Sequence, residues 1–372
     1  MRLAFIGDVV GRRGREVVQE NLPRLKARLG LDFIVLNGEN AAGGFGITPR
    51  IAAEFHDAGV DCITTGNHVW DQREIIGYLE ADRRILRPAN FPEGTPGRGV
   101  TVLPAPGGRQ VMVLNVMARL FMDPLDDPFA AVDRLLADIA LPRDVDAVIL
   151  DFHGEASSEK MAMGHYLDGR VTLVVGTHTH VPSADLQILP GGTAYQTDAG
   201  MCGDFDSVIG MKKDAAIHRF IRKMPGERLS PAEGPATLCG LVVETDDRTG
   251  LAVRVEPLRL GGRLAPAIPD FDRVAAAGCD TPILPGVMPV TKIGTIARSE
   301  QLSGAPFPPA LAARFERVAD DPEAVRKLGI EHASEMCQRL LDEGAPGIHF
   351  ITFNRSTATR EVWTNLQVGA RV

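Results

Sequence analysis

Two histidines stand two residues apart in the stretch GTHTH, residues 176–180, which directly follows the apolar run VTLVV. The chain has only nine histidines, so a pair at the end of a predicted strand points to chemistry. On an extended segment, side chains two positions apart point the same way. Imidazole is the commonest metal ligand in proteins. The spacing therefore predicts a metal site that uses His178 and His180.

Similar polar side chains follow four other predicted strands. RLAFIG is followed by an aspartate, DFIVLN by GEN, DCITTG by an Asn-His pair, and AVILDF by a histidine. The carboxyl ends of parallel strands lie along one edge of a sheet, where α/β proteins place their sites. We therefore expect carboxylate, amide and imidazole groups to converge there. The residues concerned are Asp8, Glu39, Asn40, Asn67, His68 and His153.

Each of these residues, taken singly, has a simpler explanation. Asp8 after a strand can cap a helix, and GDVVGRRGR can form a glycine-rich phosphate loop. Asn67 and His68 can form a turn, and His153 can be a hydrogen-bonded core histidine. Capping does not explain five such strand ends together. The set predicts a mixed oxygen and nitrogen site suited to Fe, Mn or Zn, and poorly suited to Ca or to thiolate sites.

The number of candidate ligands exceeds what one tetrahedral ion needs. In a two-metal site the ions lie about 3.5–4 Å apart, and a hydroxide between them attacks phosphorus in line. A division of His178 and His180 between two ions fits this arrangement.

The composition excludes several function classes. The chain has 372 residues, is 44% hydrophobic, and carries a net charge of −8 with a pI near 5.6. With no run of Lys or Arg, this argues against binding to double-stranded nucleic acid. We find no signal peptide and no apolar run of membrane-spanning length. Five scattered cysteines suit reduced thiols, so we expect a cytoplasmic protein that does not bind membranes.

Short apolar runs alternate with helical patterns at 16–29, 49–58 and 72–79, which predicts βαβ units and a mostly parallel sheet. Further strands are expected at VMVLNV, AVILDF and VTLVVG. ATLCGLVVET and GLAVRVEPLRL, joined by DDRTG, predict an antiparallel hairpin.

The pattern breaks in GGRLAPAIPD, residues 261–270, which is rich in glycine, proline and alanine. We therefore expect a first domain at 1–264, a linker at 265–270 and a second domain at 271–372. In the second domain we expect strands at TPILPGVMPV and GIHFITFN and helices at 308–318 and 322–343, with Gly344 ending the latter.

The motifs GDVVG, NGENAAGGFGIT, TTGNHVWD, DFHGEASSEK, GTHTHVPSAD and TAYQTDAGMCG resemble the YmdB-type branch of the calcineurin-like metallophosphoesterases. The resemblance covers about residues 1–264 and implies a layered α/β/β/α sandwich. The usual GDxH motif has Val10 in place of its histidine, and in the YmdB branch the asparagine of GEN, here Asn40, fills that gap.

The resemblance also implies roles for single residues. One metal ion would be held by Asp8, Glu39, Asn40 and His180. The second would be held by Asn67, His153 and His178, with Glu39 bridging both ions. His68 would be catalytic, either stabilising charge on the phosphate or protonating the leaving oxygen.

The implied activity is that of a dinuclear phosphoesterase. Such an enzyme hydrolyses phosphodiesters, such as 2′,3′-cyclic nucleotides, or phosphomonoesters by attack of a metal-bridging hydroxide. Iron or manganese is the expected metal and zinc also fits, while the expected partner is a small phosphate-ester substrate. A homo-oligomer is left open.

Other residues near these motifs allow two interpretations. Asp198 and Glu155 can either bind the outer ring nitrogens of ligand histidines or cap helices. Phe45 and Trp70 can either flank a nucleobase or pack against neighbouring side chains.

From about residue 271 to 369 the chain resembles the C-terminal part of methylenetetrahydrofolate reductase, a flavin-dependent (β/α)8 barrel. The motifs PGVMPV and HFITFNRS carry this resemblance. A barrel closes only with all eight strands, and this segment supplies about two βα units. We therefore expect a partial barrel-like segment, no bound FAD and no reductase activity, with Arg355 in a structural role. The unpaired strand edges of such a segment need cover from the first domain or a second copy, unless it stays poorly ordered.

Two alternatives to the hydrolase remain open at this point. The C-terminal segment can act as a flavin- or folate-binding module. The strand-end ligands can also belong to a non-catalytic, metal-bound regulatory protein.

Overall fold

A computed structural model describes residues 1–224, 226–269, 286–296, 307–342, 345, 347–351 and 357–366. The chain divides into two compact units, residues 1–272 and 273–372.

The first unit contains a seven-stranded sheet. Strands β1, β3 and β4 run parallel, and β12 and β13 form the predicted antiparallel hairpin beside β1. The short strands β11 and β2 follow β12 at one end of the sheet, and β4 lies at the opposite end. The strands are β1 (Arg2–Ile6), β2 (Asp8–Val9), β3 (Phe33–Asn37), β4 (Cys62–Thr64), β11 (Met201–Asp204), β12 (Ala236–Thr245) and β13 (Ala252–Gly261).

A second sheet of six strands completes the unit. Strands β6, β7, β8 and β10 run parallel, while β5 pairs antiparallel with β6. Strand β5 was not predicted from the sequence, and it connects to β6 through the short turn η1 (Pro106–Gly108). The strands are β5 (Val100–Ala105), β6 (Arg109–Met117), β7 (Ala147–His153), β8 (Leu173–Thr177), β9 (Gln187–Ile188) and β10 (Ala194–Gln196).

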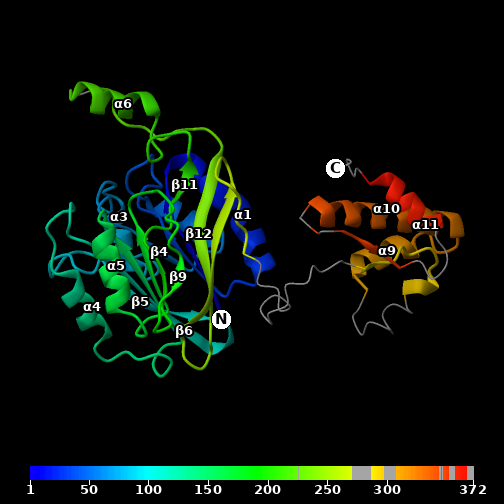
Figure 1. Cartoon of the computed structure of the whole chain (residues 1–372), viewed down its shortest axis with the longest axis horizontal. Coiled ribbons are helices and arrows are strands. Elements are labelled where there is room, and N and C mark those ends of the chain that lie inside the picture. Colours follow the sequence, from blue (N-terminus) through cyan, green and yellow to red (C-terminus); the bar gives the residue numbers. More distant parts are fainter. Residues whose placement is uncertain are drawn as a thin grey trace. The chain divides into compact units, whose positions relative to one another are not determined.

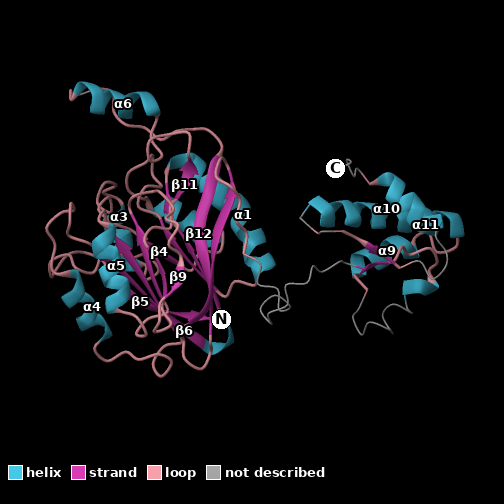
Figure 2. Ribbon diagram, viewed as in Figure 1, coloured by secondary structure: helices cyan, strands magenta, loops and turns pink. Residues whose placement is uncertain are grey.

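Side-chain alternation along the strands builds three hydrophobic layers. Leu3 and Phe5 of β1 face the second sheet and join the core between the sheets. Ala4 and Ile6 point the opposite way, into the core beneath the helices. A third core lies between the second sheet and its own helices. The predicted α/β/β/α sandwich is confirmed (Figures 1 and 2).

Helices cover the outer face of each sheet. The core under the first sheet's outer face takes side chains from α1 (Gly11–Leu29), α2 (Pro49–Asp57) and α3 (Ile75–Ala81). The second sheet is covered by α4 (Pro128–Leu136) and α5 (Ser157–Tyr166). Another helix, α6 (Lys213–Arg222), projects away from both sheets (Figure 1).

The second unit has a small core of its own. Two parallel strands of two residues each, β14 (Gly286–Val287) and β15 (His349–Phe350), pair with each other. Val287, Ile330, Cys337 and Val362 form the centre of the core. The helices are α9 (Pro309–Glu316), α10 (Pro322–Asp342) and α11 (Thr357–Asn365).

The two helices expected at 308–318 and 322–343 are confirmed to within two residues. Gly344, Arg355, Cys279, the first half of the strand expected at 281–290 and the last linker residue, 270, lie outside the described residues. In the part of the chain that is described, no helix has the length and apolar character needed to cross a membrane.

Candidate metal centre

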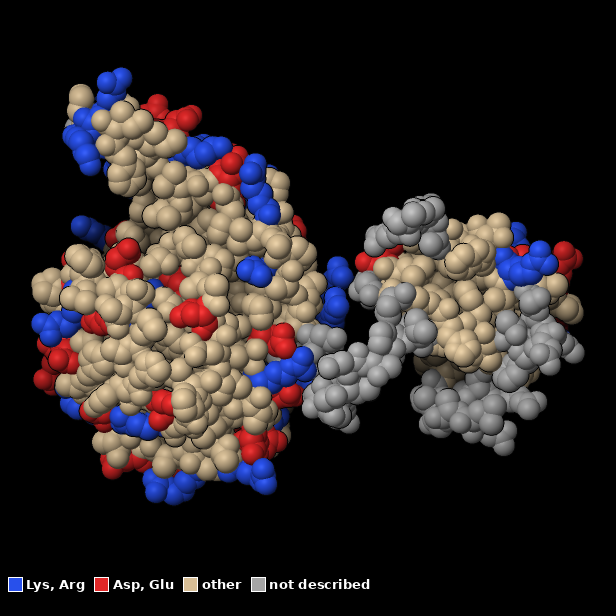
Figure 3. All heavy atoms as spheres, in the orientation of Figure 1, with Lys and Arg blue, Asp and Glu red and all other residues tan. Residues whose placement is uncertain are grey.

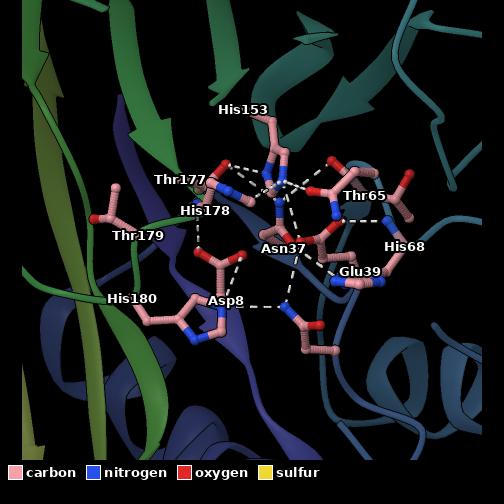
Figure 4. A network of polar contacts seen from close by, with 12 residues as sticks. Asp8, Asn37, Glu39, Thr65, His68, His153, Thr177, His178, Thr179 and His180 are labelled. Atoms are coloured by element: carbon pink, nitrogen blue, oxygen red, sulfur yellow. Dashed lines mark hydrogen bonds and ion pairs between the residues drawn. The ribbon is translucent and has the colours of Figure 1, made fainter. Parts of the chain in front are cut away.

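The five predicted strand ends do converge, but they belong to two sheets. Strands β1, β3 and β4 end at the site from the first sheet, and β7 and β8 end there from the second. The expectation of one sheet edge was therefore wrong. Because the sheets pack face to face, the carboxyl ends of their parallel strands reach the same point (Figure 4).

His153 lies at the centre of one group of ligand atoms. Its Nε2 atom is 3.1 Å from Glu39 Oε1, 2.9 Å from Asn67 Oδ1 and 3.1 Å from His178 Nδ1. Candidate ligand atoms of Glu39, His153 and His178 all lie within 4.8 Å of one another. The arrangement suits a cation between them.

A second group adjoins the first through Glu39. Asn40 Nδ2 lies 3.2 Å from Glu39 Oε1 and 3.1 Å from His180 Nε2. Asp8 Oδ1 is 3.9 Å from His180 Nε2. The structure thus gathers all seven candidate ligands, here called the strand-end cluster: Asp8, Glu39, Asn40, Asn67, His153, His178 and His180.

His68 stands at the rim of the strand-end cluster. Its backbone N–H donates to Glu39 Oε2 at 3.1 Å, and its Nδ1 atom is 2.8 Å from Asp71 Oδ2. The Phe45 ring meets the His68 ring edge-on, with centroids 5.1 Å apart. While Nδ1 is held by Asp71, the opposite ring nitrogen, Nε2, makes no hydrogen bond to the described residues. Trp70 instead packs against Phe91.

The outer nitrogens of the ligand histidines have partners that fix the ring orientations. His153 Nδ1 lies 2.9 Å from Thr177 Oγ1, whose hydroxyl donates to the buried Asp151. His180 Nδ1 donates to the Ile209 carbonyl at 2.8 Å, so the ring lone pair lies on Nε2, which faces Asn40. Glu155 Oε2 lies 3.4 Å from His178 Nε2, as one interpretation of Glu155 predicted.

The GTHTH loop is held by a buried ion pair that the sequence analysis missed. Lys160 Nζ lies 2.9 Å from Asp198 Oδ2 and donates to the Thr177 carbonyl at 2.7 Å. Asp198 also accepts hydrogen bonds from the backbone and hydroxyl of Thr179. The interpretation of Asp198 as a histidine partner is therefore wrong, because it binds the loop between the two histidines.

Both loop histidines have strained backbones. His178 has φ 98° and His180 has φ 68°, a region that residues other than glycine seldom adopt. Such strain persists only where the surroundings enforce it, and it collects at functional sites. The Lys160–Asp198 pair supplies part of that enforcement.

Burial and neighbouring charges shift the pKa values of several groups in the strand-end cluster. Burial raises the pKa of Asp8 well above its usual value, and Asp8 Oδ1 has no hydrogen-bond partner among the described residues. Burial opposes the charge on Glu39 and His153, but their mutual attraction outweighs it. The attraction between the two groups lowers the pKa of Glu39 to about 2 and raises the pKa of His153 to about 9. Burial lowers the pKa of His178 to about 3.

These features fit a bound cation. A buried carboxylate oxygen without a partner costs free energy unless a cation or hydrogen bond satisfies it. Gly66 adds a second sign, since any side chain there would collide with His153 and Glu39. The glycine keeps the cluster uncrowded.

Sequence reasoning missed Lys160, Asp151, Thr177 and Gly66. Thr177 and Gly66 lie inside the quoted motifs GTHTH and TTGNHVWD, and Asp151 lies inside AVILDF. A charged residue within an otherwise apolar strand run is a usable signal for Asp151. Lys160 gives no comparable signal, because a helical lysine is normally exposed.

Comparison with known proteins decides the family. A family model described as "YmdB-like protein" matches residues 4–258. The chain belongs to this family. The 2′,3′-cyclic-nucleotide 2′-phosphodiesterase of Bacillus subtilis is 48% identical over 256 residues, which cover 69% of this chain and 96% of the relative. A putative phosphatase/phosphodiesterase of Mycoplasma pneumoniae is 35% identical, over 70% of this chain and 93% of the relative.

Solved structures agree with the YmdB-like assignment. A hypothetical protein of Thermus thermophilus has a TM-score of 0.66 and 42% identity, covering 71% of this chain and all of its own. A Mycoplasma pneumoniae protein described as a novel phosphatase has a TM-score of 0.65 and 35% identity, covering 70% of this chain and 93% of its own. The predicted enzyme class, a phosphoesterase, is confirmed.

The second predicted resemblance is also confirmed. A methylenetetrahydrofolate reductase family model matches residues 270–367. A probable methylenetetrahydrofolate reductase (NADPH) of Caenorhabditis elegans is 41% identical over 90 residues, or 24% of this chain. The matching segment spans only 14% of that relative's length.

Proposed function

We propose that this YmdB-like chain hydrolyses phosphodiesters, including 2′,3′-cyclic nucleotides, with two metal ions held by the strand-end cluster. The observation that carries the proposal is the position of Glu39, whose Oε1 atom lies 3.1 Å from His153 Nε2 and 3.2 Å from Asn40 Nδ2 and so belongs to both groups of ligands. The name of the Bacillus subtilis relative supports the cyclic-nucleotide substrate. Phosphomonoesters form the second substrate class, in keeping with the name of the Mycoplasma pneumoniae relative.

The proposed division of ligands follows the two groups of contacts. Asp8, Asn40 and His180 would hold one ion, and Asn67, His153 and His178 the other. Glu39 would contribute to both. Iron or manganese suits this mixture of oxygen and nitrogen donors, and zinc is the next choice.

The metal ions, when bound, would supply positive charge to the phosphate and activate a water for attack on phosphorus. The chain's own residues do the rest. Asp71 holds His68 Nδ1, so that the opposite ring nitrogen can donate a proton to the leaving oxygen. Phe45 packs on the same ring and limits its rotation.

Metal analysis combined with one variant tests the proposal. We expect about two metal ions per chain in protein purified without chelator, and hydrolysis of bis-p-nitrophenyl phosphate and 2′,3′-cAMP. His68→Ala is expected to keep the metal and lower kcat by about 10²–10⁴-fold, the usual contribution of a general acid or base.

Three other outcomes discriminate the alternatives. Metal bound without turnover favours the regulatory protein. No metal and no turnover after reconstitution with iron or manganese overturns the hydrolase. Loss of metal in His68→Ala would show that His68 is a ligand and not the acid.

We propose that residues 1–264 form the hydrolase domain, 265–270 a linker, and 271–372 a segment without reductase activity. The small share of the reductase-like relative that is matched supports this. FAD-dependent NADH oxidation with methylenetetrahydrofolate would contradict it, and bound yellow flavin would favour a flavin-binding module.

We propose a cytoplasmic location and a small phosphate ester as the partner in catalysis. The described cysteines support a reducing compartment, because Cys62, Cys202, Cys239 and Cys337 are all free and buried. Immunoblotting of separated cytoplasmic and extracytoplasmic fractions of cells that make the protein would test this location.

A further inference from the structure

Helix α6 has almost no packing of its own. Only Ala216 of its ten residues is buried. Ile217, Phe220 and Ile221, spaced three and one residues apart, form one apolar stripe and are 44–70% exposed. Met224, two residues past the helix end, is 61% exposed. The helix therefore presents an apolar face to its surroundings.

Such a helix needs a covering surface. Helices shorter than about 12–15 residues are marginal in water, and most draw their stability from packing of an apolar face. Among the described residues, the side-chain tie from α6 to the body of the first unit is the ion pair of Lys213 with Asp206, at 2.9 Å. An exposed apolar surface of this kind marks an interaction site.

The charge of α6 indicates what kind of surface can bind this helix. Residues 212–223 contain five basic residues and one acidic residue and so carry a net charge of +4. Because the whole chain carries −8, all other residues together carry −12. Figure 3 shows these basic groups around an uncharged surface on the projecting helix. The charged residues of this segment are Lys212, Lys213, Asp214, Arg219, Arg222 and Lys223. A matching partner surface is apolar and acidic.

The chain carries a surface of this description, the loop of residues 119–127 between β6 and α4. Phe121 is 88% exposed and Leu120 is 49% exposed. Asp123 and Asp126 are exposed beside them. The loop is anchored rather than loose, because the Glu159 carboxylate accepts the backbone N–H groups of Arg119 and Leu120 at 2.9 Å.

We propose that α6 of one chain docks on the 119–127 loop of a second copy. Within one chain both surfaces are exposed, so neither covers the other. Pairing of α6 with α6 would bring like charges together. An anionic membrane is a poorer partner, because the chain as a whole carries −8.

Both docking segments adjoin the strand-end cluster. The Ile209 carbonyl, which binds His180, lies four residues before Lys213. The N–H of Ala118, next to the loop, donates to the His153 carbonyl at 2.9 Å. Each docking segment is therefore connected, through residues next to it in the chain, to one ligand histidine of the strand-end cluster.

The first test is the mass of the full chain by light scattering at micromolar concentration. We expect the measured mass of the wild type to be two or more times the 40.0 kDa mass of one chain, as a whole multiple. Phe220→Glu/Ile221→Glu is expected to run as a single chain. Val253→Glu, at a 57% exposed position on β13, is the matched control and should keep the wild-type mass. A wild type that is monomeric, or an α6 variant that keeps the wild-type mass, overturns the proposal.

A charge exchange identifies the partner surface. Arg219→Glu/Arg222→Glu alone and Asp123→Arg/Asp126→Arg alone are each expected to weaken association about tenfold or more. The chain that carries both exchanges should associate as the wild type does, which only a folded protein can do. If the combination does not restore association, α6 does not bind this loop. Binding of the wild type to phosphatidylglycerol vesicles, lost in Phe220→Glu/Ile221→Glu, would assign the helix to a membrane instead.

Discussion

The two units of this chain both carry sequence motifs of an enzyme family, but among the described residues only the first shows the elements that the motifs require. In residues 1–272, five strands from two sheets bring seven candidate ligands to one point. In the described part of residues 273–372, the strands are two residues long and only two in number. The first unit matches 96% of a relative, while the second matches 14% of one.

The difference teaches that a motif indicates function only when its supporting structure is complete. Each histidine of the strand-end cluster is oriented by an outer partner, such as Thr177 behind His153. Those partners are in turn fixed by cores on both faces of two sheets. The described residues of the second unit form one small core around Val287 and Ile330, and the matching segment is too short to close a barrel.

The largest effect is expected from a substitution of Glu39 in the first unit. Glu39→Gln keeps the shape but removes the charge shared by the two groups of ligands. We expect loss of bound metal and a fall in kcat/KM of about 10³-fold or more, measured by elemental analysis and by hydrolysis of 2′,3′-cAMP.

Glu155→Gln is the matched control, because Glu155 contacts His178 from outside the cluster and is half exposed. Its expected loss is about tenfold, as for an outer partner of a metal ligand. Equal losses in the two variants would contradict the central position of Glu39.

The next largest effect is expected at Lys160, which supports the strand-end cluster through Asp198. Lys160→Met leaves Asp198 as a buried charge without its partner, so we expect the free energy of unfolding to fall by about 3–5 kcal/mol. Urea denaturation measures this. Arg248→Met removes an ion pair with Asp246 in which the arginine is 88% exposed, and it should change stability by less than about 1 kcal/mol. A small effect at Lys160 would mean that the loop needs no such support.

The sequence sufficed for the parts of this site that follow from local pattern. Glu39 and His153 each come at the end of an apolar run, so the position of a ligand could be predicted from the strand alone. The packing of the two sheets against each other could not, because contacts such as that of Asn37 in β3 with Asp151 in β7 join residues 114 positions apart. Lys160 was missed for the same reason, since its burial depends on Asp198 in a distant segment.

Metal affinity should depend on pH through His153. Its pKa is raised to about 9 by Glu39 and Asp8 despite burial, so the ring is protonated at neutral pH when no cation is bound. A metal needs the neutral ring and must displace that proton. Affinity is therefore expected to rise about tenfold per pH unit from pH 7 to about 9 and then level off. Calorimetry in buffers of different ionisation enthalpy measures the proton released, and no proton release would contradict the raised pKa.

The smallest expected effect comes from the second unit. The relatives that match the first unit consist of little else, since this chain covers 96% of the Bacillus subtilis enzyme and all of the Thermus thermophilus structure. Removal of residues 273–372 should therefore leave kcat/KM for 2′,3′-cAMP within about twofold, as expected where the activity belongs to the first unit alone. Circular dichroism shows whether the shortened chain folds. If it folds and binds metal but loses more than this activity, the C-terminal unit takes part in catalysis, and the contrast between the two units does not hold.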